Sequence, residues 1–595
     1  MSIALLSKVT FYGLMSDKEK VLEDLQDMGC IHVVPLGKNS GHAETAGLSQ
    51  TTRNALTFLL SCPEKRHQIL NPTNFHAASV EGRALEIKER IQPLQNERDF
   101  LLRRIGELCP WGYFTSPPPE VLGELKLWLY IVPHYQMKEL QGSGVVWKEI
   151  NRDNRFRYVV IVASQKPTST PGEYVPMEDV SLSDLESRLE EVEVELEDLQ
   201  AARVALTRWL TLFIRTVNQL ENQEARVNAA QQTFDSAPIF AVQGWTKLSN
   251  GQNLQSYAQR TGLALTVEEP GPEDEPPTLL ENPEPVAGGQ DLVSFYMMPS
   301  YRLWDPSSIV FFSFAVFFAM ILSDAGYGAL LGVILIGYWA RMGHTETGCR
   351  MRRLFAVLVA ASVVWGVLTG SFFGVSPPKG SILASLKLFD IQDATTMMIF
   401  SILIGAVHIT IATLGTAWTH RGKRQAVASI GWTAIIVGGC ALWLSSQDLV
   451  PEVFADVSPW IMGVGMFCVL LFSGSKSNLP WRLVDGVLAL AGVTRAFGDV
   501  LSYLRLFALG LASASLALAF NDLAQQISES VAGFGTFLAL LILLLGHGIN
   551  LVLGIMSGVV HGLRLNYIEF FNWGVPEEGT VFRAFAKKEG TTWSP

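Results

Sequence analysis

The chain has 595 residues, a mean hydropathy of +0.25, 17% charged residues and a formal net charge of -11. Because apolar residues concentrate after residue 305, a single soluble globule is excluded, and one half of the chain is expected to be soluble and the other half membrane-embedded. The acidic balance argues against nucleic acid as a partner, and the absence of metal-ligand spacings and of P-loop, HExxH and GxSxG motifs predicts no cofactor and no catalytic site.

The soluble half, residues 1 to about 290, is predicted to form small α+β lobes. Strands are expected at 9–12 and 31–34 around a helix opened by a capping box of Ser16 and Glu19, with Gly29 after the helix end. Further strands are expected at 127–132 and 158–163, and a β-α-β unit at 238–265. Residues 267–290, rich in Pro, Glu and Gly, are interpreted as a linker to the membrane half.

Two heptad patterns lie between these strands. One covers 87–108 and is interrupted by Arg98, and the other covers 182–220 and is interrupted by Arg203. Two unequal seams in one chain predict an antiparallel helical hairpin or coiled-coil rod. The acidic run at 186–198 is most simply the solvated face of that rod.

The membrane half contains seven apolar segments, at 307–340, 352–374, 394–418, 427–446, 458–473, 483–520 and 532–572. The first is too long for one ordinary span and is interrupted by Ser-Asp-Ala-Gly-Tyr-Gly at 323–328, so we expect two helices there and eight spans in total. An even number of spans returns the C-terminus to the side of the N-terminal domain.

Basic residues in the loops predict the orientation. Nine lie in loops that would be cytosolic if the N-terminus is cytosolic: Arg341, Arg350, Arg352, Arg353, Arg421, Lys423, Arg424, Lys476 and Arg482. The loops on the other side hold only Lys379 and Lys387. By the positive-inside rule, both termini are therefore expected in the cytosol.

Arg505 lies within a mostly apolar segment, 483–517, that reads as one long helix. A guanidinium at that depth costs about 2.5 to 3.5 kcal/mol on insertion scales, so it requires a partner or a function. On a continuous helix it shares a stripe with Leu501 and Ala512, and Ser502 lies at the edge of that stripe. One interpretation pairs Arg505 with Asp499 of its own bundle, although Arg495 is better placed for Asp499. The favoured interpretation pairs Arg505 with a carboxylate of another subunit.

The last apolar segment carries a second polar pattern. Five of its polar residues fall within about 100° of arc: His547, Asn550, Ser557, His561 and Arg564. Such a stripe normally faces a bundle interior or water, so it predicts either a polar ion path or hydrogen bonding between helices. Arg564 alone, near the helix end, is also compatible with snorkelling to the interface. His408 is weaker evidence for proton transfer.

Several ordered motifs resemble the membrane stator subunit of V/A-type rotary ATPases, called subunit a in vacuolar enzymes and subunit I in archaeal and bacterial ones. They are GDVLSYLRLFALGLA at 498–512, HGLRLNYIEFF at 561–571, YMMPSYRLWDPS at 296–307, SDAGYG at 323–328, GSFFGV at 370–375, IGAVHI at 404–409 and QGW at 243–245. The similarity covers nearly the whole chain and is strongest from residue 296 onwards.

The resemblance implies that Arg505 faces the carboxylates of a rotor ring and that Arg564 is the second arginine of the family. Ser502, Asp499 and the polar residues of the last helix are the remaining ion-translocation candidates. Vacuolar members have a histidine and a glutamate where this chain has Ser513 and Gly554. The implied fold is a cytosolic arm, 1–290, of α+β lobes on an antiparallel coiled coil, followed by an eight-helix membrane domain, 291–595, whose last two helices are long and tilted.

The implied function is ion conduction through two half-channels, with protons or sodium ions driving or driven by rotation, in a non-catalytic subunit of the ATPase complex. The implied partners are the c or K subunits of the rotor ring, the peripheral stalks, the ATPase head indirectly, and the lipid bilayer of a prokaryotic plasma membrane. An alternative is a self-contained secondary transporter with a cytosolic regulatory domain, although no inverted repeat of the SYLRL segment occurs before residue 480. A purely structural anchor would not need Arg505.

Overall fold

The computed structural model describes residues 2–36, 49–113, 123–167, 170–176, 181–378, 380–391, 393–474, 479–530, 533–588 and 590. Contacts divide the chain into two units. The first comprises Met1–Gly13, Cys30–Val34 and Ala241–Ala584, and the second Leu14–Gly29, Pro35–Phe240 and Phe585–Pro595. The division predicted at residue 290, between a cytosolic arm and a membrane domain, remains a prediction. Lys379 and Lys476 of the loop-charge count lie outside the described residues.

The first unit contains a sheet with strand order β2-β8-β1-β9. Its strands are β1 (Leu6–Leu14), β2 (Ile31–Val34), β8 (Ile239–Lys247) and β9 (Ala264–Glu268), with α8 (Gly251–Thr261) between the last two. β1 pairs antiparallel with β9, and β2 pairs antiparallel with β8. The strands predicted at 9–12 and 31–34 and the unit predicted at 238–265 are therefore confirmed.

The predicted linker at 267–290 is packed against the rest of this unit. Thr278 and Leu280 are buried, and their backbones form bridges to Val581 and Ile3. α9 (Ala287–Tyr296) already begins within the predicted linker range. The proline-rich composition therefore marks an extended segment held in place by backbone pairing, which a flexible linker would lack.

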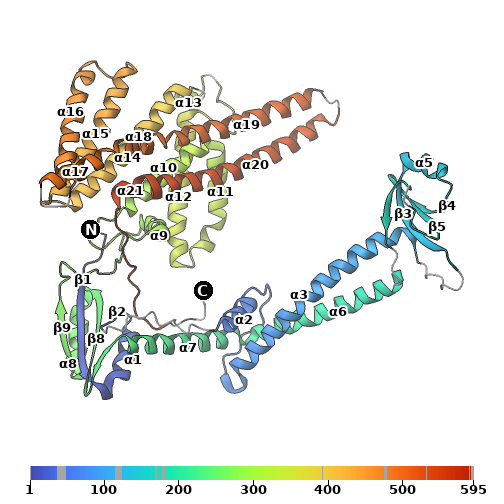
Figure 1. The fold of residues 1–595 in the computed structure, drawn as a ribbon, viewed down its shortest axis with the longest axis horizontal. Coiled ribbons are helices and arrows are strands. Elements are labelled where there is room, and N and C mark those ends of the chain that lie inside the picture. Colours follow the sequence, from blue (N-terminus) through green and yellow to red (C-terminus); the bar gives the residue numbers. More distant parts are fainter. Residues whose placement is uncertain are drawn as a thin grey trace. The chain divides into compact units, whose positions relative to one another are not determined.

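The rest of the first unit is helical. Its helices are α10 (Ser307–Leu322), α11 (Ala325–Met342), α12 (Glu346–Thr369), α13 (Ile382–Ser385), α14 (Ala394–Thr419), α15 (Arg424–Ser446), α16 (Val453–Phe472), α17 (Leu479–Leu490), α18 (Val493–Leu501), α19 (Leu504–Ser530), α20 (Gly535–Arg564), a π-helix (Leu565–Phe570) and α21 (Phe571–Gly574). Figure 1 shows α19 and α20 as a long pair of neighbouring helices.

Among the described residues, seven helical stretches are long and apolar enough to cross a membrane: α11, α12, α14, α15, α16 and the stretches Pro480–Ser530 and Gly535–Gly574. The 16-residue α10 is apolar but shorter. The split predicted at 323–328 is confirmed, because α10 ends at Leu322 and α11 begins at Ala325. The predicted count of eight spans is not confirmed. The chain is a multi-pass membrane protein by the length and composition of these helices.

The prediction of one continuous helix over 483–517 is wrong. The segment is divided among α17, α18 and α19, with breaks at Ala491-Gly492 and at Ser502-Tyr503. At the second break the Ser502 hydroxyl donates a hydrogen bond to the Gly498 carbonyl, a pattern that bends helices. Arg505 therefore lies in the first turn of α19.

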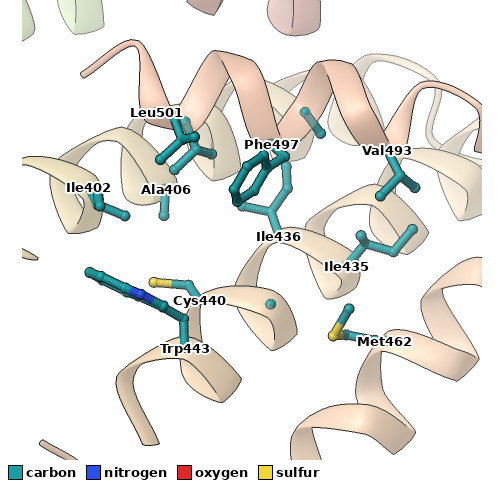
Figure 2. Close-up of a pocket in the computed structure, with 13 residues that line it drawn as sticks. Ile402, Ala406, Ile435, Ile436, Cys440, Trp443, Met462, Val493, Phe497 and Leu501 are labelled. Carbon is teal, nitrogen blue, oxygen red and sulfur yellow. The ribbon is translucent and has the colours of Figure 1, made fainter. Parts of the chain in front are cut away.

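A cavity of about 260 Å³ lies between α18 and the helices α14, α15 and α16 (Figure 2). Its lining is apolar apart from the Cys440 thiol and the indole of Trp443, and includes Ile402, Ile436, Met462, Phe497 and Leu501. Such a lining offers no set of polar groups to replace the hydration shell of an ion, so this cavity is not a candidate for the ion path.

The second unit contains a separate sheet with strand order β4-β5-β3-β6. Its strands are β3 (Lys126–Pro133), β4 (Val146–Arg152), β5 (Phe156–Ala163) and β6 (Glu173–Val175), and β7 (Phe234–Ser236) follows later in the chain. Its helices are α1 (Lys18–Met28), α2 (Gln50–Leu60), α3 (Ala77–Leu108), α5 (Met137–Gly142), α6 (Leu182–Leu206) and α7 (Leu210–Gln231). The strands predicted at 127–132 and 158–163 are confirmed.

The predicted capping box at Ser16 is wrong. A 3-10 turn, Met15–Asp17, precedes α1, which begins at Lys18 and has no side-chain cap. The Ser16 hydroxyl contacts the side chain of Asp17. The predicted end of α1 is confirmed, because Gly29 adopts the left-handed conformation with φ 58°.

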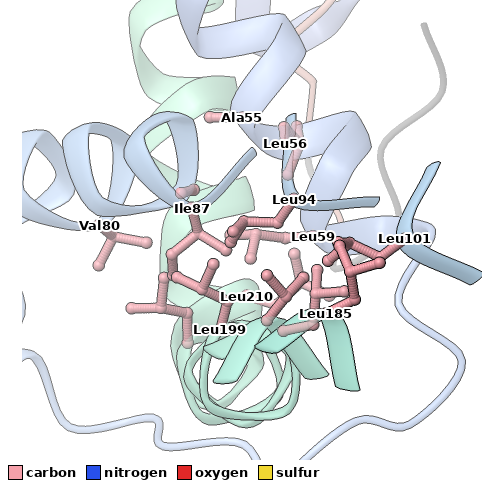
Figure 3. Packing of buried hydrophobic residues seen from close by; sticks show 14 of the residues in the cluster. Ala55, Leu56, Leu59, Val80, Ile87, Leu94, Leu101, Leu185, Leu199 and Leu210 are labelled. Atoms are coloured by element: carbon pink, nitrogen blue, oxygen red, sulfur yellow. The ribbon is translucent and has the colours of Figure 1, made fainter. Parts of the chain in front are cut away.

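The two heptad segments share one apolar core (Figure 3). Ile87, Leu94 and Leu101 of α3 are buried with Leu185 and Leu199 of α6, as the heptad pattern predicts. The predicted coiled-coil rod is not confirmed. α2 also contributes buried residues to the same core, and a 3-10 turn at Thr207–Trp209 interrupts the second seam.

Candidate ion-translocation site

The Arg505 guanidinium lies beside a carboxylate that the sequence analysis did not identify. Its Nη1 atom is 4.0 Å from Oε1 of Glu569, and the Arg505 side chain keeps 24% of its surface exposed. This separation is too long for a hydrogen bond. Among the hydrogen bonds of the described residues, Nη1 of Arg505 and Oε2 of Glu569 are buried without any partner. The two charges attract each other, but neither is saturated.

Glu569 faces this site because the last apolar segment does not continue as a regular α-helix. The π-helix Leu565–Phe570 follows α20 and changes the direction in which each later side chain projects. Glu569 is 3% exposed. The sequence held one signal for it, a lone carboxylate inside the apolar run NYIEFF, but a straight-helix projection did not place it on the polar stripe.

Arg564 and His561 complete a group of charged and titratable side chains. Arg505 interacts electrostatically with both Arg564 and His561, and Glu569 interacts with both arginines. The Nδ1 atom of His561 is buried without a hydrogen bond to any described residue. We call Arg505, His561, Arg564 and Glu569 the arginine cluster. Three of its four members were predicted as site residues.

Asp499 is not the partner of Arg505. Its carboxylate accepts a hydrogen bond from Nε1 of Trp573 at 2.8 Å and lies 3.7 Å from Nε of Arg495. The preference of Asp499 for Arg495 over Arg505 is therefore confirmed. The in-chain carboxylate beside Arg505 is Glu569, and Ser502 marks the bend in front of α19.

The other half of the predicted stripe on α20 forms a hydrogen-bonded network. The Asn550 side chain donates to the Tyr327 hydroxyl at 3.0 Å and to the Ser513 carbonyl at 2.9 Å. The two ring nitrogens of His547 lie 2.7 Å from the Tyr327 hydroxyl and 3.0 Å from Oδ1 of Asn521. We call Tyr327, Ser513, Asn521, His547 and Asn550 the tyrosine network. It joins α11, α19 and α20.

Asp324 anchors this network to a neighbouring loop. Its carboxylate caps α11 by accepting from the Tyr327 N–H at 3.0 Å. It also accepts from the N–H groups of Phe373 and Gly374, each at 2.9 Å, and from the Ser371 hydroxyl at 2.7 Å. With four donors, a carboxylate that is only 3% exposed is fully satisfied.

Ser513 and Gly554 lie next to each other. The resemblance implies a histidine and a glutamate at these two positions in vacuolar enzymes. A Cβ atom on Gly554 would be 3.9 Å from the Ser513 hydroxyl and 3.0 Å from Leu322. Asn550 lies beside both small residues, and its Oδ1 atom is 3.4 Å from the Ser513 hydroxyl. Ser557, one turn further along α20, is half-buried between the network and the cluster.

His408 belongs to the helix packing around Tyr503. Its Nδ1 lies 2.7 Å from the Tyr503 hydroxyl, and its ring stacks on Phe570 at 4.3 Å. His408 is 4% exposed. The structure thus supports the interpretation of this histidine as a link between helices.

A small polar pocket of about 110 Å³ borders α19 on a face formed with the loop after α12. Polar lining residues include Thr369, Ser371, Lys387, Asp390 and Ser515. Lys387 and Asp390 are paired at 3.4 Å. The pocket shares Ser371 and Gly374 with the loop that Asp324 holds, so the tyrosine network and the pocket are adjacent.

The comparisons with known proteins agree on one class. The chain is 27% identical to the A-type ATP synthase subunit I of Methanocaldococcus jannaschii, with 98% of this chain and 89% of that protein covered. It is 29% identical to the V-type ATP synthase subunit I of Chlamydia pneumoniae, covering 84% and 81%, and 26% identical to V-type ATP synthase subunit I 1 of Treponema pallidum, covering 95% and 97%. No family model matches. These relatives do not favour the secondary-transporter alternative, and over nearly its whole length the chain is a homologue of the subunits I of V-type and A-type ATP synthases.

Proposed function

We propose that the chain is the ion-conducting stator subunit of a V/A-type rotary ATPase, in which Arg505 faces the membrane carboxylates of a rotor ring. Protons or sodium ions reach and leave the ring through two half-channels bordered by this chain. The chain supplies no catalytic site, and ATP is made or hydrolysed on partner subunits. The homologous subunits I support the assignment to such a complex.

The observation that carries the proposal is the unsaturated guanidinium of Arg505. A buried Nη1 atom without a hydrogen bond to a described residue is costly, because a charged donor that leaves water needs an acceptor in its place. Glu569 at 4.0 Å compensates the charge without occupying this donor. A carboxylate arriving from another subunit would complete the set with the short, charge-assisted hydrogen bonds that arginine favours.

The surface of α19 beside Arg505 supports the approach of another helix. Ala508, Ala512, Ser515 and Ala519 are exposed and recur at the spacing of one helix face, which also carries Arg505. Small residues on a lipid-facing helix allow a second backbone to come close. We therefore assign this face to the rotor.

Arginine keeps its proton in proteins, so its positive charge is fixed while a rotor carboxylate passes. That charge favours the ionised carboxylate and releases the bound ion to one half-channel. It also opposes the leakage of cations between the two half-channels. Each elementary charge that crosses 100 mV contributes about 2.3 kcal/mol, so several crossings are needed for one ATP.

We assign one half-channel to the side of the polar pocket along α19 and the other to the side of His561 and Arg564. The pocket provides hydroxyl groups and the Lys387–Asp390 pair beside α19. His561 and Arg564 lie near Arg505 in the last turn of α20. From the charge asymmetry of the loops and the archaeal and bacterial relatives, we infer a protein of a prokaryotic plasma membrane with cytosolic termini, held by peripheral stalks through residues 1–290.

The test uses the whole complex, purified through a tag on this chain and reconstituted into vesicles. Arg505→Ala should leave the rotor and ATPase subunits copurifying while ATP-driven ion uptake is abolished. Arg505→Lys should also pump poorly, because lysine lacks the planar fork and loses its proton when desolvated. Normal uptake by assembled Arg505→Ala complexes would exclude the mechanism, and loss of assembly in both variants would favour a structural pair with Glu569.

A further inference from the structure

Glu569 has no role in the function proposed so far, and its surroundings are unusual for a structural carboxylate. It is 3% exposed, its Oε2 is buried without a hydrogen bond to any described residue, and its Oε1 lies 4.0 Å from Nη1 of Arg505. A buried carboxylate in a structural role normally accepts several hydrogen bonds, as Asp324 does. Glu569 instead has only its own backbone N–H and the nearby positive charges of Arg505 and Arg564 as stabilising contacts among the described residues.

The local backbone holds this carboxylate in place. Glu569 lies in the π-helix Leu565–Phe570, and its neighbours Leu565, Asn566 and Phe570 are each 0% exposed. The Asn566 side chain donates to the Gly562 carbonyl at 3.0 Å, which satisfies a carbonyl just before the irregular turn. Single π turns inside α-helices occur frequently at functional sites. The π-helix thus holds the Glu569 carboxylate next to α19, whereas a regular α-helix would direct this side chain elsewhere.

The Arg505 and Glu569 side chains are close to each other but form no hydrogen bond. Because 4.0 Å exceeds hydrogen-bond distance, the guanidinium keeps donors available while its charge is compensated. The charged groups that face Glu569 are Arg505 of α19, Arg564 of α20 and Asp499 of α18, and His561 lies near both arginines. Two positive charges therefore surround the Glu569 carboxylate, and one of them, Arg505, has the unsaturated donor.

We propose that Glu569 is the resting partner of Arg505, the fixed carboxylate that takes the guanidinium in the interval between one rotor carboxylate and the next. The inference rests on the proposed function. When a rotor carboxylate arrives, Arg505 turns its free donors toward it, and as that carboxylate leaves, the guanidinium returns toward Glu569. Arg505 is then never left as an unpaired charge in a low-dielectric site, so the release step is faster. Glu569 is a positioning residue that exchanges no ion with the rotor.

The test is Glu569→Gln in the reconstituted complex, because glutamine keeps the shape and hydrogen-bonding capacity but removes the charge. Without the competing carboxylate, Arg505 holds each rotor carboxylate longer. We expect the maximal rate of ATP-driven ion uptake per assembled complex to fall about tenfold, with the KM for ATP unchanged. The matched control is Glu577→Gln, which removes an exposed carboxylate eight residues further along the chain and should pump as the unmodified complex does.

A pH profile separates the charge effect from a packing defect. Removing the negative charge of Glu569 strengthens the positive field at Arg505, so a lower pH is needed to protonate a rotor carboxylate nearby. In a proton-driven complex, the limb of the rate profile that reports this protonation should shift to lower pH in Glu569→Gln and stay in place in Glu577→Gln. A merely structural role would lower the rate without moving the limb.

The outcomes distinguish this inference from the proposed function. If Arg505→Ala abolishes uptake while Glu569→Gln pumps at the normal rate with an unchanged profile, the resting-partner role is wrong and the proposed function stands. If Glu569→Gln does not assemble, Glu569→Asp is measured instead, since it keeps the charge but withdraws it from Arg505. A reduced rate in assembled Glu569→Asp complexes supports the inference, and a normal rate overturns it.

Discussion

The tyrosine network and the arginine cluster lie on the same pair of helices, α19 and α20, yet they differ in how their polar groups are satisfied. In the network, Tyr327, Asn550 and His547 each find partners within 3.0 Å, and Asn550 is 1% exposed. In the cluster, Arg505, His561 and Glu569 each have a buried polar atom without a partner among the described residues. A regular polar stripe in sequence therefore contains two physically different regions.

This difference separates the polar groups that stabilise the packing of membrane helices from the polar groups that can still bind another molecule. Satisfied hydrogen bonds stabilise the contact of α11, α19 and α20, because breaking them leaves polar groups in a medium without water. Unsatisfied groups cost free energy in the isolated chain, and this cost is recovered when a partner arrives. On this basis we interpret the network as a brace and propose the cluster as the place where another subunit acts.

The largest effect on the network is expected from Asp324→Ala. The change leaves the N–H groups of Tyr327, Phe373 and Gly374, of which the first is buried, without their acceptor. The free energy of unfolding should fall by about 3 to 5 kcal/mol. A thermal melt of the detergent-solubilised complex checks this. An unchanged melting temperature would show that Asp324 does not hold the brace.

Tyr327→Phe should have a smaller effect of the same kind. It removes the hydroxyl that joins His547 to Asn550 and should cost about 1 to 3 kcal/mol. Because a brace acts through stability alone, ion uptake per assembled complex should stay near that of the unmodified protein. Loss of ion uptake at an unchanged melting temperature would show that the network belongs to the ion path, and would contradict the distinction between the network and the cluster.

Accessibility to water sharpens the comparison along α20. In a background without native cysteines, a cysteine at half-buried Ser557 should react with small hydrophilic thiol reagents, whereas cysteines at buried Asn550 and at the exposed, apolar position Val552 should react slowly. The predicted polar stripe carries both Asn550 and Ser557, so an ion path along the whole stripe would make both positions reactive. Leu551 is not a suitable lipid-facing control, because it packs on the cluster around Phe318. Equal rates at all three positions would remove the distinction.

The smallest effect concerns His32, a histidine that belongs to neither region. Burial lowers the pKa of His32, whose Nδ1 accepts a hydrogen bond from the Arg583 N–H at 2.9 Å. The pKa of His32 in the folded protein lies below its unfolded value of about 6.5. The contribution of neutral His32 to the free energy of unfolding is therefore fully present above about pH 6.5, and it declines as the pH falls below that value because the unfolded chain takes up a proton more readily. His32→Gln should flatten this part of a melting-temperature profile. The same slope in the variant would contradict the assignment.

Much of the fold was predictable because it depends on periodicity. The strands around Gly29, the split at Ser323, the apolar seams and the approximate helix ranges all follow from hydrophobic spacing and turn residues. The break before Leu504 was not predictable, since it depends on the packing of Tyr503 against Gly405 and on its contact with His408. Arg505 was singled out by its depth in an apolar segment, and Arg564 by the polar stripe of the last helix. Glu569 was missed because the π-helix changes the angular position that sequence spacing assigns.

The central claim is that the face of α19 that carries Arg505 meets the rotor ring. The most direct test places a benzophenone-maleimide on a cysteine at exposed Ala512, in the assembled complex without native cysteines, and identifies the products of illumination by mass spectrometry. The control is a cysteine at Phe467, which is 60% exposed on α16. We predict an adduct with a rotor-ring subunit from position 512 and none from position 467. A ring adduct from 467 but not from 512 would contradict the account.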